Sequence, residues 1–470
     1  MINLRPYQAQ SIADVRSAYT RGARSVCLTA PCGAGKTIIF SEIARLATIK
    51  NTRIAIIVHR DSLLMQASEK LTASGLAHGI IAPGYTPSSH GVQVASLMTL
   101  VRRLDMWEFD LLILDECHHA LSPSYAKIID RWPRAKILGV TATPCRTSGH
   151  GLDAMFQKLV LGPSILELIN DGYLVDPVTY GPSHALDLST IGTKAGEYDL
   201  KQLAKHMDDP RITGDAVAKY QSTCPGVPAM VFTVNVKHAE DVAAAFTMSG
   251  FRAASIDGEM PIELIRSRIA ALSTGEIQVL ASCSLVSEGT DIPNVVCAIM
   301  LRPTRSLSLH IQQAGRALRP VYAQGHDLST RDGRLAAISA GPKKKAIILD
   351  HAGNVYRFMT VDEHRDWTLA GRKKKKRGEV VFSLSECPEC HAVHRPDPIC
   401  PYCGYKYPHG VAEPNEVGGD LAPIDKVALR RAKWKEVAQA RTLEQLKIIA
   451  KNRGYHPGWP YHIMRERAAR

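Results

Sequence analysis

Long apolar runs are missing from this sequence of 470 residues. No stretch approaches the roughly 20 consecutive apolar residues that a helix needs to cross a bilayer, so the sequence predicts no membrane association. The first residues, MINLRPYQAQ, contain none of the apolar core that a secretory signal peptide requires. The sequence therefore predicts a cytoplasmic protein.

The eleven cysteines lack the spacing of a disulfide framework. Seven are scattered singly along the chain, and the other four form two CxxC pairs near its end. In a chain without a secretion signal, this pattern favours reduced thiols and one metal site over disulfide bonds.

Acidic residues are too few to balance the basic ones, and the imbalance lies near the C-terminus. The formal net charge is +13, and residues 342–470 contribute ten of these charges, with 25 Lys and Arg against 15 Asp and Glu. A basic C-terminal part behind a nearly neutral body favours a polyanionic partner, most simply nucleic acid, over a merely soluble basic surface.

Short apolar runs alternate with amphipathic segments over the first 350 residues. A stretch richer in Gly, Pro and polar residues, around 162–225, divides these runs into two groups. The runs are 25–30, 53–59, 111–116 and 136–143, then 229–234, 252–257, 277–283, 296–301 and 345–350. Buried strands separated by helices are typical of parallel α/β sheets. The sequence thus predicts two α/β domains with a cleft between them.

The pattern changes after about residue 350. A basic run, a segment rich in Cys, Pro and Tyr, and two helical patterns follow, and Thr442 with Gln445 is predicted to cap the last helix. We expect five parts: α/β domains at 1–165 and 166–350, a basic linker at 351–380, a four-cysteine segment at 381–410 and a basic helical module at 411–470.

APCGAGKT, residues 30–37, follows an apolar run and opens a helical pattern. Gly33 and Gly35 allow a tight turn that points backbone N–H groups at phosphates. Lys36 can neutralise the β- and γ-phosphates, and the Thr37 hydroxyl can bind Mg²⁺. This context favours a nucleotide site over an ordinary glycine-rich turn.

LLILDECHHALS, residues 111–122, supplies the carboxylates that such a site needs. Asp115 ends an apolar run and is predicted to hold Mg²⁺, while Glu116 is placed to orient or deprotonate the attacking water. The next residues, Cys117, His118 and His119, are of types that bind metals. The glycine-rich loop at 30–37, here called the P-loop, nevertheless favours Mg²⁺–ATP chemistry over a transition-metal site.

HIQQAGRALRP, residues 310–320, contains two arginines in the second α/β domain. The spacing of Arg316 and Arg319 predicts that both lie on one face of a helix. If the cleft holds ATP, both could stabilise the charge on the γ-phosphate during its transfer. The alternative is a surface helix with scattered arginines.

Taken in order, these segments resemble the motifs of superfamily 2 helicases of the DEAD/DEAH-like type, which have two RecA-like domains. The matching segments are LRPYQ (4–8), APCGAGKT (30–37), VHR (58–60), DECH (115–118), TATP (141–144), VFTVNVKHA (231–239), SEGTDIP (287–293) and QQAGRALR (312–319). The resemblance implies that 1–165 is the ATP-binding domain and 166–350 the helicase C-terminal domain.

The resemblance also implies roles for individual residues. Lys36, Glu116, Arg316 and Arg319 would be the catalytic groups, with Mg²⁺ held by Thr37 and Asp115. The ATP-contacting set would be Arg5, Gln8, Pro31, Cys32, Gly33, Ala34, Gly35, Lys36, Thr37, Gly289 and Asp291. The coupling set would be His118, Thr141 and Thr143, and the set that grips a DNA strand would be Arg60, Ser96 and Thr99.

Two residues depart from the family pattern. Cys32 stands where Thr is usual, and Cys117 stands where Ala is common. Both side chains are small, so we expect function to survive. Both thiols are expected to raise the sensitivity of the protein to oxidation or thiol modification.

Two CxxC pairs with nine residues between them form the last strong motif, which comprises Cys387, Cys390, Cys400 and Cys403. Four thiolates suit tetrahedral Zn²⁺, so the motif predicts a structural zinc site, with iron or a redox pair as alternatives. His391 and His394 lie in the intervening loop and could replace one thiolate.

LDHAGNVYRF (349–358), the four-cysteine segment and RGYHPGW (453–459) are similar to the RadD-like branch of bacterial and phage-encoded DNA helicases. This resemblance implies an ATP-dependent DNA helicase or translocase of repair, recombination or replication in the bacterial or host cytoplasm. Its DNA would be single-stranded or branched duplex, and its protein partners a single-stranded-DNA-binding protein or other repair and replication proteins. The alternatives are an RNA helicase and the motor subunit of a restriction-type complex without its own nuclease.

Overall fold

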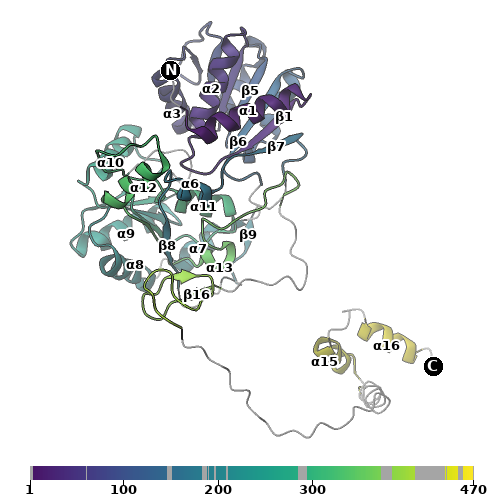
Figure 1. Cartoon of the computed structure of the whole chain (residues 1–470). Coiled ribbons are helices and arrows are strands. Elements are labelled where there is room, and N and C mark those ends of the chain that lie inside the picture. Colours follow the sequence, from purple (N-terminus) through teal and green to yellow (C-terminus); the bar gives the residue numbers. More distant parts are fainter. Residues whose placement is uncertain are drawn as a thin grey trace. The chain divides into compact units, whose positions relative to one another are not determined.

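The computed structural model of the chain contains two compact units, Met1–Tyr407 and Pro408–Arg470 (Figure 1). It describes residues 4–59, 61–145, 151–182, 188, 190–194, 197–207, 210–283, 294–371, 384–407, 440, 442–453 and 459–468. Every helix in these ranges is too short or too polar to traverse a lipid bilayer.

The first α/β domain is built on a parallel seven-stranded sheet with the order β3-β4-β2-β5-β6-β1-β7. Its strands are β1 (Ser25–Thr29), β2 (Ile54–Val58), β3 (Gly79–Ile81), β4 (Val92–Ser96), β5 (Leu111–Asp115), β6 (Lys136–Thr141) and β7 (Lys158–Leu161). Because all strands are parallel, their carboxyl ends meet at one edge of the sheet, where nucleotide sites form.

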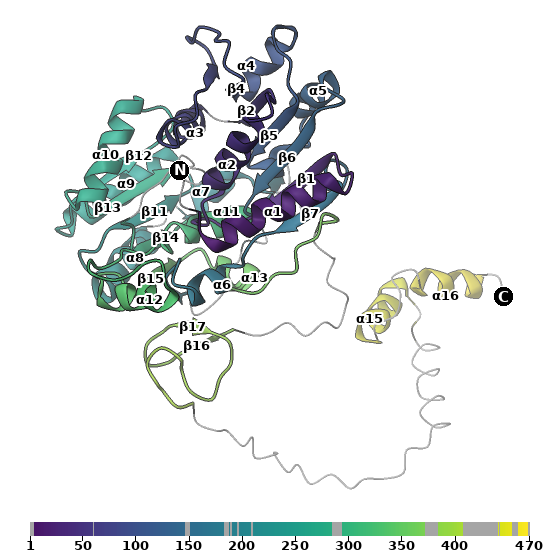
Figure 2. The same cartoon turned by 45° about the horizontal axis from the view of Figure 1, so that its top comes forward.

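Helices cover both faces of this sheet. They are α1 (Pro6–Thr20), α2 (Lys36–Thr48), α3 (Asp61–Ala73), α4 (Leu97–Arg102) and α5 (Pro123–Arg131), with short 3₁₀ turns η1 (Leu104–Met106) and η2 (Cys117–His119). Successive strand residues point to opposite faces: Ile54 and Ile56 pack in the apolar cluster with α1–α3, and Ala55 packs in the cluster with α4 and α5. Helix α1 runs alongside β1 and β7 (Figure 2).

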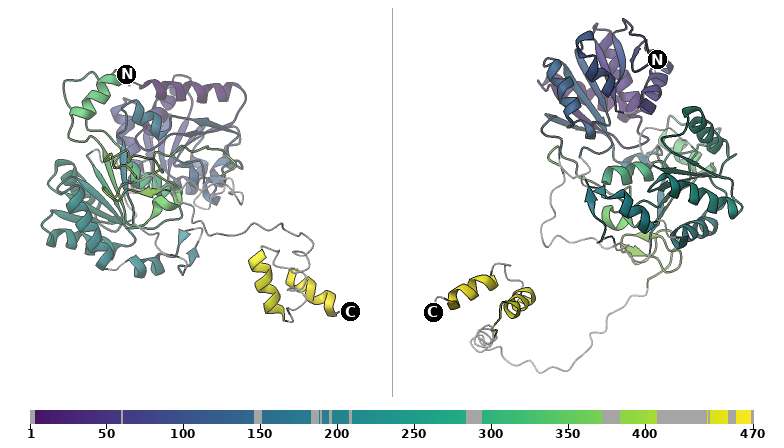
Figure 3. Two further views of the ribbon diagram at one scale, coloured as in Figure 1. Left: turned by 60° about the horizontal axis from the view of Figure 1, so that its bottom comes forward. Right: turned by 180° about the vertical axis from the view of Figure 1, so that it is seen from behind.

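The second α/β domain has a parallel six-stranded sheet with the order β12-β13-β11-β14-β15-β8, seen from behind in Figure 3. Its strands are β8 (Pro177–Tyr180), β11 (Ala229–Thr233), β12 (Ala253–Ile256), β13 (Val279–Cys283), β14 (Cys297–Met300) and β15 (Ala346–Asp350). Its helices are α6 (Ile165–Asn170), α7 (Leu200–Met207), α8 (Pro210–Thr223), α9 (Val236–Met248), α10 (Ile262–Thr274), α11 (Leu307–Gly315), α12 (Arg331–Ala340) and α13 (Asn354–Phe358).

The predicted fold class, two tandem RecA-like parallel-sheet domains, is confirmed, and all nine predicted strands are present. A small antiparallel pair, β9 (Thr193–Lys194) and β10 (Glu197–Tyr198), lies outside both sheets. The domain limits drawn from the sequence stay predictions.

Between β7 and residue 371, the chain passes between the two α/β domains twice. The first passage runs from the end of β7 through α6 to β8. The second follows α13: Leu369 returns to the first domain, where its carbonyl accepts hydrogen bonds from the N–H groups of Leu152 (2.7 Å) and Asp153 (3.1 Å). We call residues 359–371 the return segment.

The four-cysteine segment forms a small hairpin of β16 (Ser385–Glu386) and β17 (Val393–His394). It lies against the edge strand β8, where Ala392 forms an antiparallel bridge with Tyr180. In the second unit, the described helices are α15 (Leu443–Arg453) and α16 (Trp459–Ala468). The predicted capping pair is confirmed, because Gln445 N–H donates to Thr442 Oγ1 (3.3 Å) and Thr442 N–H donates to Gln445 Oε1 (3.2 Å). The helix that it caps, α15, is not the last one as predicted, because α16 follows it.

Candidate nucleotide site and metal centre

The loop between β1 and α2 has the backbone of a phosphate-binding turn. Gly33 and Gly35 both have positive φ, 87° and 78°, which disfavours any residue with a side chain. Gly35 is also crowded, because an added Cβ would lie 2.5 Å from Nε2 of Gln8. Helix α2 begins directly afterwards at Lys36, so the N–H groups of its first turn face the loop and form an anion-binding site.

Lys36 lies beside the two carboxylates at the end of β5. Its Nζ is 3.3 Å from Oε1 of Glu116, and the N–H of Glu116 donates to Oδ1 of Asp115 (3.0 Å). Burial would lower the pKa of Lys36, but Glu116, Cys32 and Asp115 outweigh it and raise that pKa. Burial and the charge of Glu116 raise the pKa of Asp115 to about 6. This arrangement can hold a divalent cation and a polyphosphate together.

His118 connects the β5 carboxylates to the end of β6. Its Nδ1 is 3.0 Å from Oγ1 of Thr141 and 3.4 Å from Oε2 of Glu116. Thr141 in turn donates from its hydroxyl to the carbonyl of Thr143 and accepts from the Thr143 N–H, both at 3.1 Å. The three residues predicted to couple hydrolysis to motion are therefore buried and contiguous with Glu116.

One cavity of about 640 Å³ lies between the two α/β domains. Its lining includes Arg5, Gln8, Pro31, Cys32, Gly33, Gly35, Lys36, Thr37, Lys70, Asp115, Glu116, Tyr173, Arg316, Arg319 and Tyr322. Ala34 is buried beneath it, and its carbonyl accepts from Gln8 Nε2 (3.0 Å). Nearly all of the residues predicted to contact ATP thus surround one space.

The two arginines reach this cavity by a different route from the one predicted. Helix α11 ends at Gly315, with Arg316 as its C-cap, so the expectation that Arg316 and Arg319 share a helix face is wrong. A short turn carries both side chains into the cavity from the second domain. The domains approach closely here, because a Cβ on Gly315 would lie 2.9 Å from Cβ of Cys32. A small residue at position 32 suits that contact.

The two unusual cysteines differ in their surroundings. Cys32 lines the cavity, whereas Cys117 is fully buried with its Sγ 3.7 Å from Sγ of Cys27. Burial raises the pKa of the Cys117 thiol well above its usual value, which makes this thiol a poor nucleophile. Cys32 is therefore the thiol that a reagent in the nucleotide cavity would meet.

Several cavity residues were not predicted from the sequence motifs, and three of them are charged or aromatic. Lys70 of α3 lines the phosphate end, and burial together with Arg319 lowers its pKa. Tyr173 and Tyr322 line the end beside Arg5 and Gln8. None belongs to a recognised motif, and only the folded chain brings these three residues together, so no local signal pointed to them.

Several predicted residues stand apart from this site. Arg60, Gly289 and Asp291 lie outside the described residues. Ser96, at the end of β4, and Thr99 of α4 are each 8% exposed and do not line the cavity. Their assignment to DNA contact stays a prediction.

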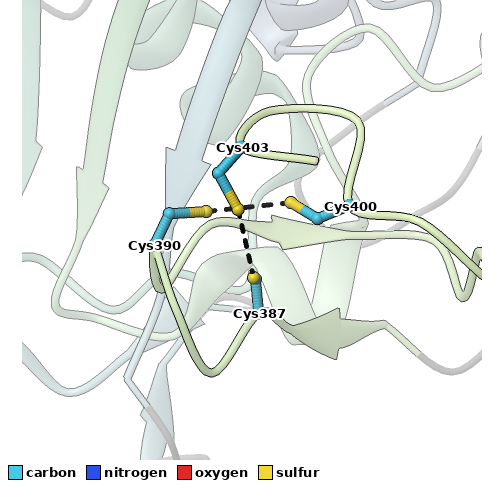
Figure 4. A group of neighbouring side chains, drawn as sticks. All are labelled: Cys387, Cys390, Cys400 and Cys403. Carbon is cyan, nitrogen blue, oxygen red and sulfur yellow. Dashed lines mark hydrogen bonds between the residues drawn. The ribbon is translucent and has the colours of Figure 1, made fainter. Parts of the chain in front are cut away.

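The four cysteines near the C-terminal end of the first unit converge, as Figure 4 shows. Their sulfur atoms all lie within 4.8 Å of one another, with 3.6 Å between Cys387 and Cys403 and 3.7 Å between Cys390 and Cys400. A tetrahedral zinc with bonds of about 2.3 Å separates its sulfurs by about 3.8 Å, so the cluster fits Zn²⁺.

Neither histidine of the loop joins the four sulfurs. His391 Nδ1 is 2.9 Å from Oε1 of Glu386, and His394 Nε2 is 2.9 Å from the Tyr407 hydroxyl. Among the described residues, the cluster of three or more His, Cys, Asp or Glu side chains that could hold a metal consists of these four cysteines and includes no histidine. The structure therefore does not support the replacement of a thiolate ligand by histidine.

Comparison with protein families matches two separate regions of the chain. Residues 1–146 match the family described as "Type III restriction enzyme, res subunit", and residues 215–321 match the "Helicase conserved C-terminal domain". These regions contain the P-loop and the arginine pair respectively, so each matched region contributes one side of the cavity.

Curated relatives cover most of the chain. A "51.5 kDa protein" of a Lactococcus phage is 28% identical over 424 residues, which are 89% of this chain and 86% of that protein. IRC3, a candidate ATP-dependent helicase of Saccharomyces cerevisiae, is 29% identical over 346 residues, 69% of this chain and 50% of the yeast protein. The chain thus spans about half the length of this yeast relative.

Solved structures share the fold at low sequence identity. A fragment of a candidate HsdR subunit of a type I restriction enzyme from Vibrio vulnificus aligns with a TM-score of 0.58 and 20% identity over 76% of this chain and 65% of that one. The Type ISP restriction-modification enzyme LlaBIII, bound to DNA, aligns with a TM-score of 0.50 and 14% identity over 77% of this chain and 32% of its own.

Proposed function

We propose that the chain is a superfamily 2 helicase and, on that premise, a DNA-dependent ATPase that moves on or remodels DNA. Its two matched regions and its helicase relatives support the premise. One observation carries this proposal. A single cavity is lined by the P-loop and two carboxylates of the first domain and by two arginines of the second.

Each group lining the cavity has a chemical task in this proposal. The P-loop N–H groups and Lys36 hold the phosphates, while Thr37 and Asp115 would hold Mg²⁺, which neutralises phosphate charge when bound. Glu116 orients the attacking water and accepts its proton. Arg316 and Arg319 stabilise the charge on the γ-phosphate from the opposite wall.

Hydrolysis is coupled to movement because the reacting phosphate contacts both walls. ATP draws the arginines toward the P-loop and closes the cleft, and loss of the γ-phosphate removes that attraction. The buried contacts from Glu116 through His118 to Thr141 give the first domain a route from the water-activating carboxylate to the end of β6. Alternate closing and opening would shift the grip of the two domains along a strand.

DNA is the proposed polymer, acting in repair, recombination or replication as the RadD-like resemblance implies. The basic charge of residues 342–470 supports a nucleic-acid partner, and the solved LlaBIII neighbour is a DNA complex. We propose that zinc, held by the four cysteines, folds the segment that contains them.

The test compares ATP turnover with single-stranded DNA, duplex DNA, branched duplex DNA and RNA. We expect stimulation by DNA, loss of turnover in Lys36→Ala and Glu116→Gln, and unchanged turnover in Lys50→Ala, whose side chain is exposed beyond the end of α2. Stimulation by RNA alone would assign the protein to RNA. DNA-stimulated turnover that persists in both site variants would overturn the assignment of the cavity.

A second candidate function is the motor of a restriction-type complex. The family matched by residues 1–146 and both solved neighbours carry restriction-enzyme descriptions, which favours this candidate. The recognised motifs are those of a motor, so in this candidate function DNA cleavage is assigned to another protein. Co-purification of a nuclease or methyltransferase with the tagged chain would support this candidate, and recovery of the chain without either would count against it.

A further inference from the structure

Three consecutive lysines precede β15, in the sequence GPKKK at residues 341–345, and the structure separates them. Lys344 and Lys345 are exposed, and Nζ of Lys345 lies 3.7 Å from Oδ2 of Asp176. Lys343, in contrast, is only 1% exposed. All three lysines add to the basic charge near the C-terminus, but Lys343 is not available to a partner outside the protein.

The side-chain nitrogen of Lys343 lies between two backbone carbonyls of the second α/β domain. It donates to the carbonyls of Val295 and Arg319, each at 2.5 Å. Val295 lies two residues beyond the SEGTDIP segment and leads into β14, while Arg319 belongs to the segment that carries the arginine pair into the cavity. Lys343 therefore ties the arginine segment to the start of a strand in the sheet.

A lysine in this buried position costs free energy. Burial and the charge of Arg319 lower the pKa of Lys343 to about 7, so its ammonium form is disfavoured relative to that of an exposed lysine. An apolar side chain could fill the same space without this cost. The property that an apolar side chain cannot supply is hydrogen-bond donation to the two carbonyls, and this property accounts for a lysine at position 343.

The peptide group after Arg319 depends on Lys343 for its hydrogen bond. Residue 320 is a proline, which has no backbone N–H, so the Arg319 carbonyl is the sole hydrogen-bonding group of that peptide. The preceding carbonyl, of Leu318, accepts instead from the Val175 N–H (2.8 Å). Lys343 and Val175 therefore fix the backbone on the two sides of Arg319.

The backbone position of Arg319 determines where its guanidinium meets a nucleotide. Arg319 lines the cavity opposite the P-loop, and a Cβ added to Gly33 would lie 3.8 Å from Cγ of Arg319. Groups that stabilise a transition state must be placed accurately, since a displacement of about 1 Å can lower a rate roughly 100-fold. A shift of the Arg319 carbonyl should therefore affect the chemical step more than the binding of ATP.

We propose that Lys343 is a positioning residue for ATP hydrolysis, which acts through the Arg319 carbonyl to place the Arg319 guanidinium against the γ-phosphate. This inference rests on the proposed ATPase function and adds to it a residue outside both the helicase motifs and the lining of the cavity. Lys343 does not touch the nucleotide, so its effect on the rate requires the Arg319 side chain.

The test is a double-mutant cycle that combines Lys343→Met with Arg319→Ala and measures single-turnover ATP hydrolysis at saturating DNA. Methionine fills much of the space of lysine but cannot donate a hydrogen bond. We expect Lys343→Met to lower the rate about 10-fold to 100-fold and to change KM for ATP about twofold or less, because Lys36 and the P-loop still hold the phosphates. With Arg319→Ala already present, Lys343→Met should lower the rate further by about twofold or less.

Two further variants complete the test. Lys343→Gln keeps an N–H donor on a shorter side chain and should lower the rate by a smaller factor, and the cycle can be built on it if Lys343→Met fails to fold. Lys201→Met removes an exposed lysine from α7 of the same domain and should match the unaltered protein.

The inference is overturned if the Lys343 variants lower the rate by the same factor with and without the Arg319 side chain, as a general loss of stability would. It is also overturned if they raise only KM for ATP, or if they hydrolyse ATP as fast as the unaltered protein. Failure of the proposed function gives a different result, since the unaltered protein itself would then show no DNA-stimulated turnover.

Discussion

At the scale of single residues, the nucleotide site concentrates charge where water is largely excluded. Asp115 shows that burying a charge there costs free energy, because burial and neighbouring Glu116 raise its pKa from 3.8 to about 6. A carboxyl whose pKa is raised on folding stabilises the fold at pH values below its pKa in the unfolded chain. This contribution is lost as the pH rises through the pKa that the group has in the folded protein. At neutral pH the folded protein therefore carries an unfavourable charge that a bound cation would compensate.

Asp115→Asn should raise the stability of the nucleotide-free protein while abolishing ATP turnover. The buried charge is present above about pH 6, so we expect Tm to rise by a few degrees at pH 8 and the gain to vanish toward pH 4. Calorimetry at the two pH values, without Mg²⁺ or ATP, measures these changes in Tm. Asp110→Asn is the matched control: Arg53 lowers the pKa of Asp110, so this change should slightly destabilise the protein at pH 8. A lower Tm for Asp115→Asn at pH 8 would contradict the argument.

Arg316→Ala should act on the chemical step more than on ATP binding. An arginine that stabilises transition-state charge contributes roughly 10³-fold or more to kcat, so single-turnover rates should fall by about that factor. Arg252→Ala is the control, because that arginine also belongs to the second domain but donates to the Gly275 and Glu276 carbonyls outside the cavity. A loss confined to KM would mean that Arg316 binds ATP without stabilising its transfer.

At the scale of elements, the sequence predicted the long apolar strands and missed the short or polar ones. β3 has three residues, and β4 interrupts its apolar residues with Gln93 and Ser96. The end of α11 was missed because Arg316 and Leu318 continue a helical pattern that Gly315 breaks.

Motif residues could be assigned because their spacing along the chain is informative. Lys70 and Tyr173 required the fold, since only parallel-strand packing and the domain crossing bring them to the cavity.

The four-cysteine segment has a structural consequence for the sheet beside it. β8 is the edge strand of the second sheet, and the segment contacts it through the Tyr180–Ala392 bridge and a hydrogen bond from the Tyr402 hydroxyl to the Pro177 carbonyl (3.4 Å). Uncovered edge strands present unpaired backbone groups to other chains. The segment therefore protects the sheet as well as offering a metal site.

Loss of the metal should promote aggregation before it abolishes ATP binding. We expect about one zinc per chain, and its removal by a chelator or by Cys400→Ser should lower Tm and increase light scattering. His391→Ala, which alters the neighbour of Cys390 but none of the four sulfurs, should keep its zinc. Zinc-free protein that is as stable as the purified form would contradict the assignment.

At the scale of the whole molecule, the second unit carries an excess of positive charge. Residues 411–470 contain 12 Lys and Arg against 7 Asp and Glu, and all of them belong to the second unit rather than to the α/β domains. Binding of basic residues to DNA releases counterions, so it weakens as salt increases. Hydrolysis and general DNA affinity should therefore be separable.

Removal of residues 408–470 should weaken DNA binding without changing DNA-independent ATP turnover. Each lost phosphate contact should reduce the slope of log K against log salt by about 0.7–0.9, so the truncated protein should show a shallower salt dependence. Titrations of both proteins with labelled DNA at several salt concentrations measure the two slopes. Equal slopes for the two proteins would show that the second unit does not contact phosphates.

The two chain passages between the α/β domains restrict how the cleft can open. A body attached at one point can swing in any direction, but one attached at two separated points turns mainly about the line that joins them. The α6 passage and the return segment, anchored through Leu369, are two such points. We therefore expect the cleft to open mainly by rotation of the second domain about that line, a motion that would carry Arg316 away from the P-loop.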